Sequence, residues 1–163
     1  MNEDEIYLKT KFWFKKKSFQ IIAGQPPNGT DSVPVIEIKD ENNLSKGSKG
    51  SYKPDLVAVS DSCLVIIECK PDYNSDDEKK LLIIKNDITR QKMLYKELRQ
   101  RNLFNMNGKK LKFDDFSFFQ KNLRFCMSNS SKRRMNNISN LYIDDDIDKS
   151  LLIKPYDEED IIN

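Results

Sequence analysis

Two acidic residues and a lysine stand where a short β-hairpin would bring them together. Asp55 follows Pro54, and after twelve intervening residues comes Glu68, with Lys70 two positions later. Because strand side chains alternate between faces, Glu68 and Lys70 point to the same side of a strand. Two neighbouring carboxylates repel each other, and a hard divalent cation between them relieves that repulsion. We therefore predict a Mg²⁺ site at Asp55 and Glu68, in which Mn²⁺ can substitute.

A cation in this position would favour hydrolysis of a phosphodiester. The backbone carbonyl of Cys69 lies between Glu68 and Lys70 and is predicted as a third protein ligand, with a phosphate oxygen as a further one. The bound metal would acidify a water and stabilise negative charge in the transition state. Lys70 is predicted to orient or deprotonate that water, which makes Asp55, Glu68 and Lys70 candidate catalytic residues.

Two residue types restrict the chemistry further. The chain has no histidine, which excludes Ser–His and Cys–His nucleophile systems and hydrolases that hold their metal by histidine. Its three cysteines (Cys63, Cys69 and Cys126) lie in apolar runs, and no two have the C-x-x-C spacing. We expect buried free thiols in a reducing compartment rather than disulfides or a zinc site.

The strands that must position the site follow from apolar runs. Residues 55–59 and 63–70 are two such runs joined by a three-residue turn, which predicts a hairpin. Further strands are expected at residues 18–23, 33–39 and 122–127, and polar loops at residues 40–53 and 71–80.

Two helices are expected from spacing at the helical period. The first covers residues 3–17, where Glu5, Leu8 and Phe12 share one face. The second runs to about residue 101 along a stripe made of Ile84, Ile88, Gln91, Tyr95 and Leu98. The resulting order of helix, strands, hairpin, helix and strand favours an α/β fold.

The chain resembles the PD-(D/E)xK nuclease superfamily over roughly residues 3–128. The resemblance is carried by Pro54-Asp55, followed by Glu68-Cys69-Lys70, within apolar flanks. The chain is similar to RecB-like nucleases and to the N-terminal nuclease domain of type I restriction motor subunits. The resemblance implies a restriction endonuclease-like core, with a central mixed β-sheet flanked by helices. It also implies that Asp55 and Glu68 bind metal and that Lys70 assists the attacking water.

The resemblance extends to the second helix and to the first. Gln91 and Tyr95 are similar to a Q-x-x-x-Y signature of related nucleases, which implies that Gln91 reaches a metal water or a phosphate. Tyr95 would then pack beneath Gln91 or contact the nucleic-acid backbone. The family often adds a metal-binding acid from its first helix, for which Glu5 is the candidate and Glu3 the competitor.

Charge is distributed unevenly along the chain. The net charge is only +2, but residues 143–163 carry eight acids against two lysines, so the preceding part is basic. This balance fits a polyanion binder whose acidic segment competes for the binding surface, or a solvated segment without a role. Lys132, Arg133 and Arg134 form a basic run that would contact nucleic-acid phosphates, or be an ordinary solvated loop.

The length of 163 residues fits one domain. We expect a single nuclease domain at residues 1–142, with residues 143–163 as an acidic segment of the same domain. No window approaches a membrane span and the first residues are acidic, so we expect a cytoplasmic protein. The resemblance to restriction nucleases implies a prokaryotic or phage-like origin.

The predicted function is a metal-dependent DNA endonuclease, a cleavage domain or subunit in restriction or DNA processing. DNA is the expected substrate, and no DNA-reading module is visible, so targeting would come from a partner subunit or from homodimerisation. A catalytically inactive module that binds nucleic acid or protein, and an RNA nuclease, are the alternatives.

Overall fold

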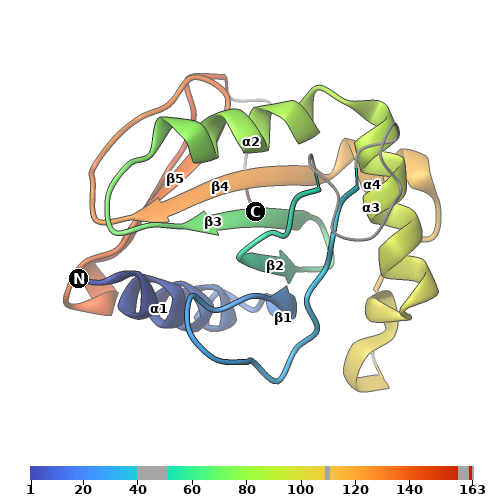
Figure 1. The fold of residues 1–163 in the computed structure, drawn as a ribbon, viewed down its shortest axis with the longest axis horizontal. Coiled ribbons are helices and arrows are strands. Elements are labelled where there is room, and N and C mark those ends of the chain that lie inside the picture. The colour runs from blue at the N-terminus through green and yellow to red at the C-terminus, as the bar shows by residue number, and fades with distance from the viewer. Residues whose placement is uncertain (40–50, 109–110, 158–161, 163) are drawn as a thin grey trace.

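The protein is an α/β structure in which helices flank a mixed β-sheet (Figure 1), as expected for the general class. The computed structural model describes residues 1–39, 51–108, 111–157 and 162. The helical elements are α1 (Glu3–Lys16), α2 (Ser75–Lys85), α3 (Ile88–Gln100), η1 (Leu103–Gly108), α4 (Phe116–Lys121) and η2 (Ile147–Lys149). The strands are β1 (Gln20–Gly24), β2 (Leu56–Val59), β3 (Leu64–Cys69), β4 (Leu123–Asn129), β5 (Ser139–Tyr142) and β6 (Leu151–Ile153).

Within the described ranges the six strands form one sheet in chain order, from β1 to β6. The first three strands are an antiparallel meander. β4 runs parallel to β3, and β5 runs parallel to β4, whereas β6 returns antiparallel to β5. The connection from β3 to β4 contains α2, α3 and α4, because adjacent parallel strands require a long crossover.

Each face of the sheet has its own apolar layer, because side chains alternate along the strands. On one face α1 packs through Ile6, Tyr7 and Phe14 against residues that include Ile67 and Cys69. On the other face α2, α3 and α4 cover a core that includes Val57, Leu64 and Ile66 (Figure 1). A residue that follows Ile66 by two positions therefore lies on the α2 side of β3.

Aromatic rings fill the part of the core below α3 and α4. Phe119 is fully buried, and its ring centroid lies 5.0 Å from that of Tyr95. Phe104, Phe113 and Phe116 each lie 6.2 Å from Phe119 by the same measure. This cluster ties α3, η1 and α4 together.

The strand predicted at residues 33–39 is wrong. Pro34 has no backbone N–H to offer a sheet, and within the described ranges this run forms an isolated bridge between Ile38 and Tyr52 in place of a strand. Ile38 N–H donates to the Tyr52 carbonyl at 2.7 Å, and Tyr52 N–H donates back at 2.8 Å. The bridge fixes the backbone of Tyr52 three residues before Asp55. Residues 40–50 of the predicted loop at 40–53 lie outside the described residues.

The loop predicted at residues 71–80 is also wrong, because α2 begins there. Asn74 caps this helix by accepting hydrogen bonds from the N–H groups of Asp76 and Asp77. The single helix expected to reach residue 101 is in fact two, since α2 ends at Lys85 and Asp87 caps α3 through the N–H groups of Thr89 and Arg90. The site is therefore covered by a helix in a run where a polar loop was expected.

The acidic segment at residues 143–163 contributes β6, which pairs with β5 at the edge of the sheet. Lys16 on α1 forms an ion pair with Asp148 of this segment at 2.6 Å. Among the described residues, no helix has both the length and the apolar character needed to cross a membrane.

Candidate active site

Asp55 and Glu68 lie across from each other at the open end of the β2–β3 hairpin. The register pairs Leu56 with Ile67, so the next pair outward is Asp55 with Glu68. Asp55 Oδ2 accepts a hydrogen bond from the Cys69 backbone N–H at 2.8 Å, which orients the carboxylate. Glu68 lies two residues beyond Ile66, on the side of the sheet that α2 covers. The hairpin thus brings the two carboxylates together as the spacing predicts.

Burial and the neighbouring acid disfavour the ionised form of Glu68. Burial and the neighbouring Asp55 carboxylate raise the pKa of Glu68 to about 10. Burial also raises the pKa of Asp55, against the lowering effect of its hydrogen bonds. Without a cation, Glu68 therefore keeps its proton at neutral pH. A divalent cation would displace that proton, because it binds the ionised carboxylates.

Lys70 also lies at this end of the sheet, and it is held by the first helix. Its Nζ donates to Glu3 Oε1 at 3.0 Å, and both side chains are about one-third exposed. Partial burial lowers the pKa of Lys70, but the hydrogen bond and charge of Glu3 outweigh that effect and the net shift is upward. Lys70 is therefore a protonated, positioned cation beside the two acids.

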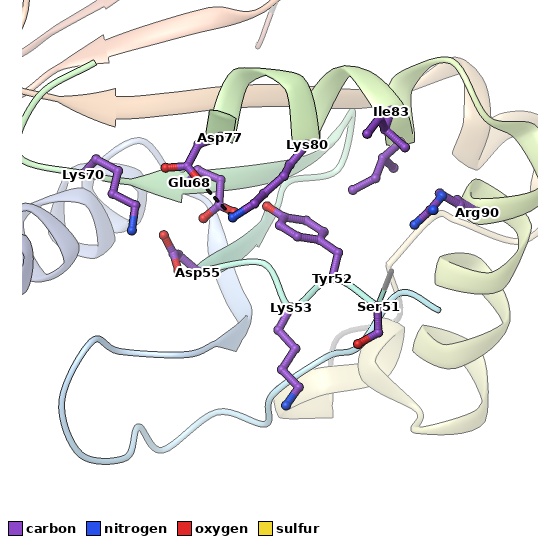
Figure 2. Close-up of a pocket in the computed structure, with 11 residues that line it drawn as sticks. Ser51, Tyr52, Lys53, Asp55, Glu68, Lys70, Asp77, Lys80, Ile83 and Arg90 are labelled. Atoms are coloured by element: carbon purple, nitrogen blue, oxygen red, sulfur yellow. Dashed lines mark hydrogen bonds and ion pairs between the residues drawn. The ribbon is translucent and has the colours of Figure 1, made fainter. Parts of the chain in front are cut away.

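Figure 2 shows a pocket of about 390 Å³ that contains all three residues. Asp55, Glu68 and Lys70 lie at one end of it, and Tyr52 and Lys80 lie in the middle. The lining continues through Ile83 on α2 to Arg90 on α3. The acids therefore face a hollow whose other polar lining includes cationic side chains, an arrangement suited to a bound phosphate.

Two more polar groups of the pocket are buried without matching partners. Asp77 on α2 is 3% exposed, and its Oδ2 has no hydrogen-bond partner among the described residues. The Tyr52 hydroxyl is likewise buried and unpartnered in the described part of the chain. Burial, followed by the charge of Glu68, raises the pKa of Tyr52. Unmatched buried polar groups cost about 1–3 kcal/mol each, so this pocket is arranged for a ligand or ordered water.

The residues present fit a hard divalent cation. Asp55 and Glu68 offer oxygen ligands only, which is the donor set that Mg²⁺ prefers. In the described ranges no three acidic or cysteine side chains are grouped to hold one ion, so backbone, water or substrate oxygens would complete the coordination. Cys69 can contribute only backbone atoms, since its thiol is buried on the α1 side of the sheet.

The predicted metal ligand Glu5 is not at the site, and this assignment is corrected. Glu5 is exposed, and its side chain accepts from the Asn2 backbone N–H at 3.0 Å in a capping box. Leu8 and Phe12 on the same face are 62% and 52% exposed, so this face of α1 points to solvent. Glu3 extends the opposite, buried face of the helix and reaches Lys70.

Gln91 does not face the carboxylates either. Its amide nitrogen donates to the carbonyls of Ile84 and Lys85, both at 2.9 Å, and its Oε1 accepts from Gln120 at 3.0 Å. It lines a different pocket, with Leu123 at the start of β4. Since Leu123 pairs with Leu64, Gln91 lies at the other end of the sheet. The buried amide joins α2, α3 and α4, so Gln91, which was expected as a catalytic residue that reaches a metal water or a phosphate, does not lie at the carboxylates.

Tyr95 is buried in the aromatic cluster and is not a nucleic-acid contact. Its ring is 8% exposed and packs on Phe104, Phe116 and Phe119. Its hydroxyl donates to the Phe113 carbonyl at 3.4 Å. The predicted stripe of the helix is thus mainly a packing surface.

The basic run at residues 132–134 does lie at the same end of the sheet as the acids. It follows β4, whose last residues pair alongside the end of β3, and Ser130 N–H donates to the carbonyl of Pro71 at 3.0 Å. All three cations are exposed, and each stacks on a tyrosine: Lys132 on Tyr142, Arg133 on Tyr73 and Arg134 on Tyr156. The Arg133 guanidinium is 3.8 Å from the Tyr73 ring centroid. The stacking preorganises three positive charges at the end of the sheet where β3 and β4 finish.

Comparison of the chain with protein-family models, with curated proteins and with solved structures finds no match.

The raised pKa of Glu68 has a measurable consequence for stability. The folded protein keeps the Glu68 proton, whereas the unfolded chain loses it near the ordinary value of 4.5. Rising pH therefore favours the unfolded state, with a slope of up to ~1.4 kcal/mol per pH unit for one proton. We expect the metal-free wild type to lose stability from pH 5 to pH 9 (roughly the span between the two pKa values) more steeply than Glu68→Gln. Urea unfolding in EDTA measures both slopes, and parallel slopes would contradict the expectation.

Proposed function

We propose that this protein is a Mg²⁺-dependent DNA endonuclease of the PD-(D/E)xK superfamily, with Mn²⁺ as a substitute metal. The observation that carries the proposal is the hairpin that sets Asp55 opposite the buried Glu68, with the positioned Lys70 in the same pocket. Two neighbouring carboxyl groups, of which Asp55 suppresses the ionisation of Glu68, suit metal-assisted hydrolysis of a phosphodiester when a fixed ammonium group lies in the same pocket.

Each side chain has a distinct part in this proposal. Asp55 and Glu68 hold the cation, which when bound acidifies a water and stabilises negative charge at the phosphate. Lys70 orients the attacking water and offsets the charge of the phosphate. It does not take the proton, because Glu3 keeps its pKa raised. The Cys69 N–H holds the Asp55 carboxylate in place during these steps.

The order of elements supports the same superfamily. α1, the antiparallel meander of β1, β2 and β3, a helical connection and the parallel strand β4 follow the order of a restriction endonuclease-like core. The acids lie at the end of the second and third meander strands, where the resemblance places them. The sheet then continues through β5 and β6, which the sequence pattern did not predict.

DNA is the proposed substrate because the stacked cations of residues 132–134 lie beside the site and can contact phosphates. The sequence contains no recognisable DNA-reading module, so sequence recognition would come from a partner subunit or from a second copy of the chain. One active site cuts one strand, and a double-strand break would need two.

The test is cleavage of a closed circular plasmid, with linear duplex, single-stranded DNA and RNA as parallel substrates. We expect nicking with Mg²⁺ or Mn²⁺ and none in EDTA. Cleavage confined to RNA would instead favour the RNA nuclease. Binding of nucleic acid without metal-dependent cleavage of any substrate would favour the inactive module.

Glu3→Gln is expected to lower the cleavage rate about tenfold, because the acceptor that fixes the Lys70 ammonium group loses its negative charge and small misplacements are costly. Glu5→Gln is the matched control, since Glu5 lies two residues away and makes only the capping box. It should leave the cleavage rate unchanged and lower stability by no more than about 0.3–1 kcal/mol, because glutamine still completes the capping box and only the negative charge at the helix N-terminus is lost. Initial rates and urea unfolding of both variants measure the two effects. Equal rates for the two variants would remove Glu3 from the site.

Arg133→Gln is expected to weaken binding of a DNA duplex and to reduce the slope of log affinity against log salt by about one. Lys121→Gln removes the same charge from an exposed residue at the other end of the sheet and should leave the slope unchanged. Fluorescence anisotropy in EDTA at several salt concentrations measures both slopes. Identical slopes for the two variants would show that the basic run is a solvated loop.

A further inference from the structure

Asp77 is an acidic residue of the pocket with no part in the reaction described above. It lies in the first turn of α2, over the end of β3, and is 3% exposed. Figure 2 shows it beside Glu68, across the pocket from Asp55. A carboxylate so deeply buried requires partners that compensate its charge and donate hydrogen bonds to its oxygens.

The partners within the described residues are insufficient for that. Asp77 Oδ1 accepts from Lys80 Nζ at 3.2 Å, but the Lys80 side chain is 55% exposed. Asp77 Oδ2 has no hydrogen-bond partner in the described ranges, although it is buried and lines the pocket. Among the described residues, the Oδ2 atom of Asp77 therefore lacks a donor, although the residue lines the pocket.

The missing donor fits a hydrated cation better than direct coordination. In the described part of the chain, no three acidic side chains are grouped to hold one ion, so Asp77 is not a third direct ligand beside Asp55 and Glu68. Mg²⁺ usually keeps several of its waters when only one or two carboxylates bind it. Waters of that shell are hydrogen-bond donors, and a buried carboxylate oxygen accepts from them well.

We propose that Asp77 is a positioning residue of the cation site, which accepts hydrogen bonds from waters in the hydration shell of the ion held by Asp55 and Glu68. The proposal rests on the function proposed above, since it requires that cation. It assigns to α2 a role in metal binding that neither the hairpin nor α1 can fill.

The experiment titrates Mn²⁺ into four proteins and measures binding by electron paramagnetic resonance and by calorimetry. The proteins are the wild type, Asp77→Asn, Asp76→Asn and Asp55→Asn. Asp77→Asn is expected to weaken Mn²⁺ binding 10- to 100-fold, the usual effect of losing an outer partner of a metal site. It should also raise the melting temperature in EDTA, because a buried charge beside Glu68 is removed. Asp76→Asn is the matched control, since Asp76 is in the same helical turn but exposed, and it should change neither quantity.

Lys80→Met separates the proposal from a purely structural pairing of Asp77 with Lys80. If the ion pair alone mattered, Lys80→Met would weaken Mn²⁺ binding as Asp77→Asn does, and that result would overturn the proposal. Unchanged Mn²⁺ affinity in Asp77→Asn, with weakened binding in Asp55→Asn, would overturn the role of Asp77 and leave the proposed function intact. No Mn²⁺ binding by the wild type would overturn both.

Discussion

Asp55→Asn and Glu68→Gln should each lower Mg²⁺-dependent plasmid cleavage by at least ~100-fold. Each replacement keeps the shape of the side chain but removes one of the two charges that hold the cation. The effect is large because, among the described residues, no group of three acidic or cysteine side chains could hold one ion, so no third direct ligand replaces the lost one. Lys70→Met should have an effect of the same order, since it removes the ammonium group that Glu3 holds against the site.

Asp61→Asn is the control for these variants. Asp61 is exposed at the opposite, turn end of the same hairpin, and its substitution makes the same change in charge. It should cleave like the wild type. Initial rates over a range of Mg²⁺ and Mn²⁺ concentrations measure both affinity and turnover. Full activity in Asp55→Asn or in Glu68→Gln would refute the assignment of the site.

Phe119→Ala should destabilise the protein by about 3–5 kcal/mol, the usual cost of truncating a fully buried phenylalanine. Phe119 is 0% exposed and contacts the rings of Tyr95, Phe104, Phe113 and Phe116. The cavity would loosen α3, η1 and α4 together. For a chain of this length the melting temperature should fall by roughly 10 °C.

Phe118→Ala tests whether this effect comes from burial. Phe118 precedes Phe119 on α4 but is 37% exposed, and the ring contact recorded for it is with Phe113 at 5.6 Å. We expect a loss of only about 1 kcal/mol from this variant. Calorimetric unfolding of both proteins gives the comparison, and similar losses would show that the aromatic cluster is not the main support of these helices.

The hairpin was the most predictable part of the site. Two apolar runs with a three-residue turn between them leave few possible registers, and β-strand alternation then decides which side chains share a face. Counting from Asp55 to Glu68 was therefore enough to place the two carboxylates opposite each other, as the pairing of Leu56 with Ile67 shows.

The helices around the hairpin were less predictable, because polar caps resemble polar loops. Residues 71–80 contain a helix signal, an asparagine followed by acids in the first turn, that was interpreted as a mobile loop. Asp77 was missed for that reason. α1 has large apolar residues on both faces, so Leu8 and Phe12 indicated the wrong inner face and Glu5 was chosen in place of Glu3.

Gln91 shows the limit of a motif without its structural context. A glutamine on an apolar helical stripe needs hydrogen-bond partners, and Gln91 makes three hydrogen bonds. The partners are neighbouring helices rather than a phosphate, because the break at Asn86 and Asp87 places α3 over the other end of the sheet. Long-range placement of this kind depends on tertiary packing, which local spacing does not encode.

The pairing of β6 with β5 matters for anyone who shortens the gene to study the acidic segment. Removing residues 143–163 would uncover the backbone N–H and C=O groups with which β5 pairs to β6, and an exposed edge of this kind can recruit strands from other molecules. Such truncated protein should form aggregates, whose loss of solubility would be mistaken for a change in nucleic-acid affinity. Amide replacements at exposed acids such as Asp145 would alter the charge while leaving the sheet closed.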